Sequence, residues 1–130
     1  MFENEEEMKF TTTEGQQQIA LIKWFKYQYQ GKIIFAIPNG AMLGGNKYAL
    51  MRKMKQEGLL PGASDLFIPI PKGNYCGLFI EMKNLGATVC KVSEDQKWFL
   101  DEMRIAGYAA EWAAGFDKAK DIIENYMKGA

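Results

Sequence analysis

The sequence predicts a single α/β domain in which a central, mixed four-stranded sheet is flanked by helices. Two observations carry this prediction: short apolar runs rich in β-branched and aromatic residues end at turn residues, and longer segments place apolar residues at helical spacing. They follow one another as helix, three strands, helix and strand (αβββαβ), with a closing helix. A chain of 130 residues with 48% hydrophobic content is long enough for one core and too short for two comfortable domains.

The predicted helices begin at residues that commonly cap helices. Thr11-Thr12-Thr13-Glu14 has the S/T-x-x-E form of a capping box, and Ser93-Glu94-Asp95-Gln96 opens a later helix in a similar way. Gly58 and Gly107 follow two of the periodic segments and are typical helix ends. We expect the four helices to span about residues 14–30, 47–57, 93–106 and 116–127.

Four short runs are predicted to form the strands, and the middle two are the most informative. The strands are expected over residues 32–37, 66–68, 78–80 and 108–112. Leu66–Ile68 and Leu78–Ile80 are joined by the turn-rich stretch Pro69–Gly77. If they pair as an antiparallel hairpin centred on that stretch, Asp65 lies directly opposite Glu81.

Opposed acids at the end of a buried hairpin are chemically unusual. Their β-carbons would be about 5 Å apart, where like charges repel unless a cation sits between them. Side chains alternate along a strand, so Glu81 and Lys83 share a face while Met82 points the other way. An acid pair and a lysine on one face are the equipment of a metal-dependent phosphodiesterase site. Two plainer readings stay open: Asp65 as a turn residue, and Lys83 as a structural ion-pair partner of Glu81.

Composition excludes several other classes of function. The chain has no histidine, which removes serine-histidine and cysteine-histidine hydrolases and histidine-containing metal sites. Sixteen basic and sixteen acidic residues give a formal net charge of zero, so any binding of nucleic acid must be local. We expect residues 1–10 to form an acidic tail and residues 11–130 to form the domain. No apolar run is long enough to span a membrane and the acidic start is unlike a signal peptide, so we expect a cytoplasmic protein without membrane contact.

The cysteines and tryptophans are expected to be structural. Cys76 and Cys90 are too few for a disulfide scaffold, so buried free thiols are expected. Trp24, Trp98 and Trp112 have apolar neighbours and are expected in the core.

A local concentration of cations offers a surface for phosphates. The segment at 47–57 holds one acid and four basic residues: Lys47, Arg52, Lys53 and Lys55. An ordinary solvated helix face would have the same composition, so both readings remain open. Asn39, in the turn Pro38-Asn39-Gly40, would either contact DNA or serve only the turn.

These motifs resemble those of a known nuclease family. Pro61-Gly62-Ala63-Ser64-Asp65, then Glu81-Met82-Lys83 and then Gln96 resemble the PD-(D/E)XK nuclease motif. More narrowly, the chain resembles the VRR-NUC branch, whose small stand-alone members occur in bacteriophages and look like Holliday-junction resolvases. The resemblance covers roughly residues 10 to 115. Its proline stands four residues before the aspartate rather than beside it, which leaves the acidic position intact. It also includes Glu14, the turn at 38–40 and Gly107-Tyr108.

The ligand types and the resemblance together suggest roles for the site residues. Hard carboxylate oxygens suit Mg²⁺ or Mn²⁺, so Asp65 and Glu81 are the expected ligands. The resemblance implies that the backbone carbonyl of Met82 joins them. Lys83 would orient the attacking water or stabilise developing negative charge.

Glu14 and Gln96 have two readings each. The resemblance implies that Glu14 assists the metal or the water and that Gln96 steadies the lysine or a phosphate. Alternatively, Glu14 only completes a capping box with Thr11, and Gln96 only completes one with Ser93.

The expected function is a metal-dependent DNA endonuclease that cuts branched DNA such as Holliday junctions. A chain with one active site must form a homodimer to place two symmetric cuts. If the gene is a phage gene, the enzyme would act in the host cytoplasm. Two alternatives belong to nucleic-acid biology: a nuclease that acts on flaps or other DNA containing single strands, and a non-catalytic binding domain, which would not need Asp65, Glu81 and Lys83 together. A metabolic or structural interaction protein would leave the basic segment unexplained.

Overall fold

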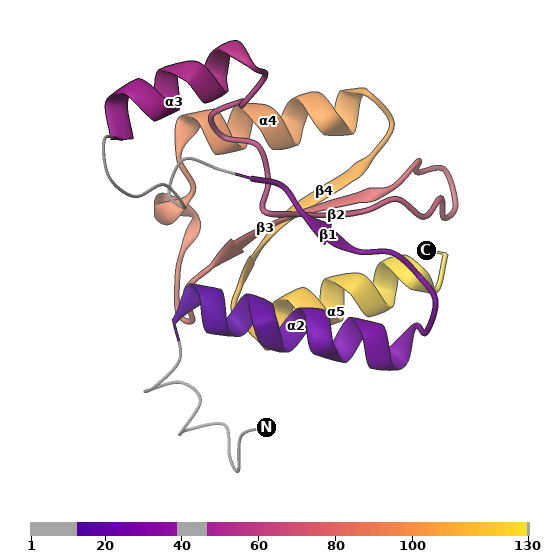
Figure 1. Cartoon of the computed structure of the whole chain (residues 1–130). Coiled ribbons are helices and arrows are strands. Elements are labelled where there is room, and N and C mark those ends of the chain that lie inside the picture. The colour runs from indigo at the N-terminus through magenta and orange to yellow at the C-terminus, as the bar shows by residue number, and fades with distance from the viewer. Residues whose placement is uncertain (1–12, 39–46, 130) are drawn as a thin grey trace.

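A four-stranded sheet lies between two layers of helices in the computed structural model, which describes residues 13–38 and 47–129 (Figure 1). The strands are β1 (Phe35–Ala36), β2 (Leu66–Ile68), β3 (Leu78–Lys83) and β4 (Ala109–Ala114), and they lie in that order across the sheet. β1 pairs with β2 and β2 with β3 in antiparallel fashion, whereas β3 and β4 run parallel. The mixed four-stranded sheet predicted from the sequence is confirmed. The acidic tail expected over residues 1–10 lies outside the described residues.

Helices cover both faces of the sheet. The helices are α2 (Glu14–Gln28), α3 (Lys47–Gln56), α4 (Glu94–Ile105) and α5 (Phe116–Met127), with a short 3₁₀ turn, η2, at Val89–Lys91. Figure 1 shows α2 and α5 side by side below the sheet and α3 and α4 above it. Within the described residues, no helix is long and apolar enough to cross a bilayer.

The main core lies between the sheet and the layer of α2 and α5. The alternation of β3 directs Leu78, Ile80 and Met82 into this layer, and all three are fully or almost fully buried. Leu21 and Phe25 of α2 and the inner face of α5 pack against them. Burying side chains of this size stabilises the fold by about 1.5–3 kcal/mol each. This packing fixes which side chains of β3 remain on the opposite face.

The opposite face of the sheet holds a cluster of aromatic rings beneath α4. The rings of Phe67 and Phe79 stack with centroids 4.3 Å apart, and Phe99 of α4 meets Phe79 edge-on at 5.3 Å. Gly77 makes room for this stack, because a β-carbon there would lie 2.9 Å from the Phe67 ring. Glu81 and Lys83 continue along the same face of β3.

A buried glutamine joins α2 to the start of α5. Gln17 is 1% exposed, and its side-chain oxygen accepts a hydrogen bond of 2.7 Å from the backbone amide of Phe116. The residue before α5 is Gly115, which has no side chain with which to cap the helix. A β-carbon at Gly115 would lie 2.5 Å from Leu85. Gln17 therefore supplies, from another helix, the acceptor that the first turn of α5 needs.

Several element boundaries differ from those expected. The first strand was expected over 32–37 and spans only Phe35–Ala36, because its partner β2 is just three residues long. β3 instead extends to Lys83, since parallel pairing with β4 continues to Lys83 and Ala114. The cap of α2 is formed by Thr13 and Gln16 rather than by Thr11 and Glu14. This correction leaves the Glu14 side chain without a capping role.

Two expectations about buried side chains are wrong. Trp98 is 50% exposed, because α4 turns Phe99 and Leu100 toward the sheet and Trp98 toward the outside. Trp24 and Trp112 are half-buried. Cys76 and Cys90 are free, as expected, but both are exposed, since each lies in a surface connection rather than in a strand or a long helix.

Candidate active site

The predicted hairpin register is confirmed and brings the two acids together. Leu66 faces Ile80, Phe67 faces Phe79 and Ile68 faces Leu78. The next pair along this register is Asp65 and Glu81. β2 begins just after Asp65 while β3 continues past Glu81, so the acid pair lies where the hairpin ends and the surface opens.

Two backbone hydrogen bonds hold Asp65 in place. Its Oδ2 accepts a hydrogen bond of 2.7 Å from the backbone amide of Met82, and its own carbonyl accepts one of 2.8 Å from the amide of Ile37. The residue is thereby anchored to both of its neighbouring strands. Such anchoring goes beyond the needs of a turn, and it points the carboxylate at β3.

Glu81 is buried, and its carboxyl group has the most strongly shifted pKa of the site. It is 3% exposed, and burial is the main reason that its pKa is raised to about 10. A side-chain hydrogen bond with Asp65 and the negative charge of Asp65 raise the pKa of Glu81 further, while Lys83 opposes them. Without a cation, the Glu81 carboxyl is therefore protonated at neutral pH and can donate to Asp65. The positive charge of Lys83 lowers the pKa of Glu81 but does not offset its burial, so a structural ion pair with Lys83 does not account for this buried acid.

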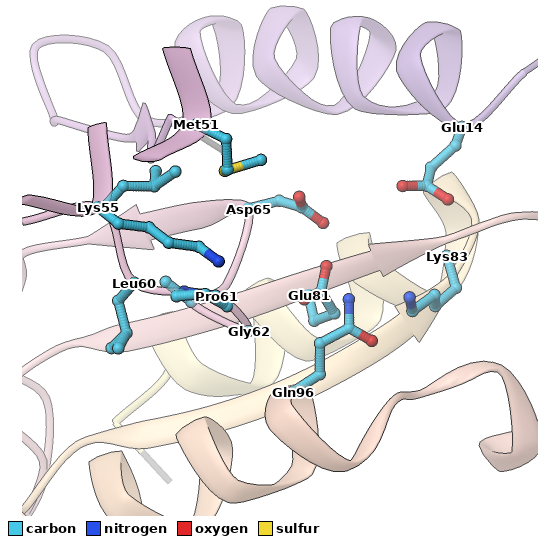
Figure 2. A pocket seen from close by; sticks show the side chains of 12 residues that line it. Glu14, Met51, Lys55, Leu60, Pro61, Gly62, Asp65, Glu81, Lys83 and Gln96 are labelled. Atoms are coloured by element: carbon cyan, nitrogen blue, oxygen red, sulfur yellow. The ribbon is translucent and has the colours of Figure 1, made fainter. Parts of the chain in front are cut away.

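Glu14 approaches the acid pair from the first turn of α2. Burial raises the pKa of Glu14, the charge of Asp65 raises it further, and Lys83 opposes both. Figure 2 shows the Glu14 side chain directed from α2 into the space beside Asp65 and Lys83. Glu14 therefore lies at the site, where the resemblance places it, and does not complete a capping box with Thr11.

Gln96 caps α4 and also lines the pocket. Its side-chain oxygen accepts a hydrogen bond of 2.9 Å from the Ser93 amide, and its own amide donates to Ser93 Oγ at 3.2 Å. The capping box at the start of α4 is thus confirmed. Because the side-chain oxygen serves the cap, the NH₂ group is the donor available to the pocket that Gln96 also lines (Figure 2).

These residues line a pocket of about 390 Å³ at the end of the hairpin (Figure 2). Its walls come from α2, α3, the connection before β2, β3 and the start of α4. The lining residues are Glu14, Met51, Lys55, Leu59, Leu60, Pro61, Gly62, Ala63, Asp65, Glu81, Lys83 and Gln96. All five predicted catalytic side chains are among them. Sequence reasoning missed the apolar wall formed by Leu59 and Leu60, although these two residues directly precede the motif that runs from Pro61 to Asp65.

Gly62 explains how the connection before β2 reaches the site. Its φ is +90°, and a β-carbon there would lie 2.5 Å from the carbonyl oxygen of Asp95 in the first turn of α4. Only glycine fits this approach. The contact seats the segment that leads to Asp65 against the helix turn that carries Gln96.

The predicted basic residues separate into different positions. Lys55 lines the pocket, on the wall opposite Lys83 (Figure 2). Lys53 forms an exposed ion pair with Glu57 at 3.9 Å, and two residues of helix turn it about 200° away from Lys55. Lys47 and Arg52 are exposed and do not line the pocket. Asn39 lies outside the described residues.

The donor set of the pocket fits a hard divalent cation. Within the described part of the chain, no three acidic, histidine or cysteine side chains lie close enough to hold a metal by themselves. Mg²⁺ and Mn²⁺ need fewer, because they keep several waters and bind through one or two carboxylates. Asp65 and Glu81 supply the two, and a cation would take the place of the proton on Glu81. The carbonyl of Met82 points to the same side of β3 as its amide, which bonds Asp65.

Comparison with known proteins identifies the family. The sequence model of the VRR-NUC domain matches residues 12–117, which is most of the chain. The chain belongs to the VRR-NUC domain family. A solved structure described as "VRR_NUC domain protein" is 29% identical, with a TM-score of 0.76, over 92% of this chain and 91% of that one. No curated protein matches the chain. The VRR-NUC family is a nuclease family, which agrees with the pocket described above.

The first prediction concerns stability in the absence of metal. A carboxyl with a raised pKa stabilises the fold below its unfolded value, near 4.5, and that stability is lost as the pH rises toward about 10. We expect the free energy of unfolding of metal-free protein to fall between pH 5.5 and pH 9. Glu81→Gln keeps a donor toward Asp65 and removes the titration, so at pH 8 it should exceed the wild type by roughly 1–3 kcal/mol.

Thermal melts in chelator across this pH range measure the effect. Glu102→Gln, at an exposed position of α4, is the matched control and should follow the wild-type curve. A wild-type melting temperature that rises with pH, or a Glu81→Gln protein less stable than wild type at pH 8, would contradict a protonated Glu81.

Proposed function

We propose that this VRR-NUC domain is a divalent-metal-dependent endonuclease that hydrolyses phosphodiester bonds in branched DNA, Holliday junctions included. The observation that carries the proposal is the buried Glu81, which is protonated at neutral pH and opposed by Asp65, with Lys83 on the same face. A protein that only binds nucleic acid gains nothing from burying one acid opposite another where phosphates would approach. A bound cation would compensate the free-energy cost of placing the acids in this way.

In the proposed mechanism, Asp65, Glu81 and the Met82 carbonyl hold Mg²⁺ or Mn²⁺. The bound cation would supply a water of lowered pKa and positive charge beside the scissile phosphate. Lys83 orients that water or donates to a non-bridging phosphate oxygen as negative charge develops. Glu14, whose pKa is raised by burial, accepts the proton of the attacking water. The NH₂ group of Gln96 steadies Lys83 or the phosphate.

Substrate and assembly follow from the number of sites. The described part of the chain carries one such acid pair, whereas resolving a junction takes two symmetric cuts, which a twofold dimer provides. Net charge is zero, so the DNA contacts must come from local cations around the pocket. Family membership supports DNA as the substrate, and we infer that the protein acts in the cytoplasm, that of the host if the gene is a phage gene.

The second prediction tests the catalytic assignment. Asp65→Ala, Glu81→Ala and Lys83→Ala should each lower the cleavage rate by a factor of about 10³ or more, because each removes a ligand or a charge from the reacting centre. Cleavage should require Mg²⁺ or Mn²⁺ and stop in chelator. A gel assay on labelled junctions, flaps, splayed arms and duplexes measures this, with Lys53→Ala as a control. Full activity in chelator, or in Glu81→Ala, would overturn the proposed chemistry.

The third prediction separates the basic residues of α3. Lys55 lines the pocket, and Arg52 lies about 60° from it around the helix, whereas Lys53 faces away. Each phosphate contact releases counterions, so the double variant Lys55→Ala/Arg52→Ala should reduce the slope of log affinity against log salt by roughly two. Lys53→Ala should leave the slope unchanged. Binding titrations at several salt concentrations in Ca²⁺ measure these slopes. Equal slopes for the wild type, the double variant and Lys53→Ala would show that α3 is an ordinary solvated helix.

The fourth prediction concerns the assembly. Light scattering should give twice the 14.8 kDa mass of one chain at micromolar concentration, and four-way junctions should be cut in preference to linear duplex. Four-way junctions should be preferred because a twofold dimer places its two active sites where they can reach two strands of the branched backbone. A mass of one chain together with equal cutting of duplex and junction would exclude the junction-resolving dimer.

A further inference from the structure

A second pocket adjoins the candidate active site. It has a volume of about 420 Å³, within the range of about 300–1,000 Å³ that small-molecule pockets occupy. The two pockets share three lining residues, Leu59, Leu60 and Ala63. Leu60 is 44% exposed and stands on the wall of the active-site pocket in Figure 2. A wall one side chain thick therefore separates the two pockets.

The two pockets have opposite chemistry. Beyond the shared wall, the second pocket is lined by aliphatic side chains of the β1 end and of α3, Ile37, Pro38 and Met54. Glu57 is the one ionisable side chain among its described lining residues. A phosphate has no cation to meet there, whereas the active-site pocket offers Lys55 and Lys83. The second pocket suits a flat, uncharged and largely apolar group.

We propose that this second pocket receives an unpaired nucleobase of the strand being cut, from a nucleotide next to the scissile phosphate. The inference rests on the proposed function and specifies its substrate. A base is joined to its phosphate through one sugar, so adjoining sites for phosphate and base are what a single nucleotide requires. The shared residues Leu59, Leu60 and Ala63 form the partition between them.

The same pocket explains a preference for DNA that is not a continuous duplex. Taking a base out of a stacked helix costs free energy, and the cost is smallest where the base is already unpaired. Flaps and single-stranded segments offer such bases at no further cost, and base pairs at a junction centre open at less cost than those inside a continuous duplex. The apolar pocket thus selects the DNA structure, while the cations and acids of the neighbouring pocket act on its phosphate.

Single abasic substitutions test this proposal. A tetrahydrofuran residue is placed at each position of a branched substrate in turn, and affinity for the Lys83→Ala protein is measured in Ca²⁺, so that the readout is binding. Removal of the base should weaken binding about 5- to 30-fold at one position in each strand that is cut, and little elsewhere. Equal affinity for every abasic substrate would overturn the proposal.

2-Aminopurine at the sensitive position provides a second readout. Its emission is quenched in stacked DNA, and the described lining of the pocket contains no aromatic ring, so emission should rise on binding. Unchanged or lower emission would contradict entry into this pocket.

Variants of Met54 locate the binding site, because Met54 lines the second pocket and not the active-site pocket. In a Lys83→Ala background, Met54→Trp should block the space and Met54→Ala should enlarge it, and both should remove the difference between the intact and the abasic substrate. Ile105→Trp, at an 80% exposed position of α4, is the matched control and should retain that difference. An abasic penalty that persists in both Met54 variants would place the base elsewhere and overturn the proposal. Failure of the nuclease assignment shows itself separately, as intact junctions that the wild type leaves uncut with Mg²⁺ or Mn²⁺.

Discussion

The opposition of Asp65 and Glu81 is the constraint around which the rest of the structure is organised. Burial of Glu81 opposite a second carboxyl group disfavours ionisation of both groups without a cation, so the surrounding fold must hold them together against repulsion. The hairpin does this through its apolar face. Leu66 and Ile80 face one another in the core, and a slip of one residue would turn them outward together with the whole pattern. The packing that stabilises the sheet thus also fixes the chemistry of its end.

One half of the pocket is formed by well-packed elements, and the other half is formed by a helix with no buried residues. Glu81 lies on β3, between two neighbouring strands, Asp65 directly precedes β2, and the side-chain amide of Gln96 is held by a helix cap. α3 is different, because none of its residues is buried. Elements with little buried apolar surface lie at the low-stability end of a fold, where binding and adjustment are least costly. The proposed metal ligands therefore lie on or directly beside the central strands, while Lys55 and Met54 line the two pockets from a helix that is not buried.

The parts of the fold that follow from local periodicity could be predicted from the sequence. The register of β2 and β3 was predictable because their apolar runs are equal in length and symmetric about the connecting loop, which left Asp65 opposite Glu81. Local patterns gave a wrong prediction where two of them overlap in the sequence. Thr11 with Glu14 and Thr13 with Gln16 both have the spacing of a capping box, and only the start of the helix distinguishes them.

Other features depend on tertiary contacts that no local pattern encodes. A basic segment was evident from composition, but the separation of Lys55 from Lys53 depends on how α3 lies on the pocket. Trp98 has apolar neighbours in sequence, yet the docking of α4 turns it outward. The second pocket combines β1, α3 and the connection before β2, segments whose proximity only the folded chain establishes.

The hydrogen bond from Phe116 to Gln17 has a consequence for the boundaries of the domain. The family match ends at residue 117, the second residue of α5, so a fragment designed on that match would keep Phe116 but lose the rest of the helix. Gln17 lies one turn after Glu14 on α2, and without the rest of α5 the Phe116 amide would no longer be held against its buried oxygen. The position of Glu14, the proposed proton acceptor on α2, therefore depends on the contact between α2 and the final helix, α5. The smallest unit that can be transplanted with its active site intact extends through α5.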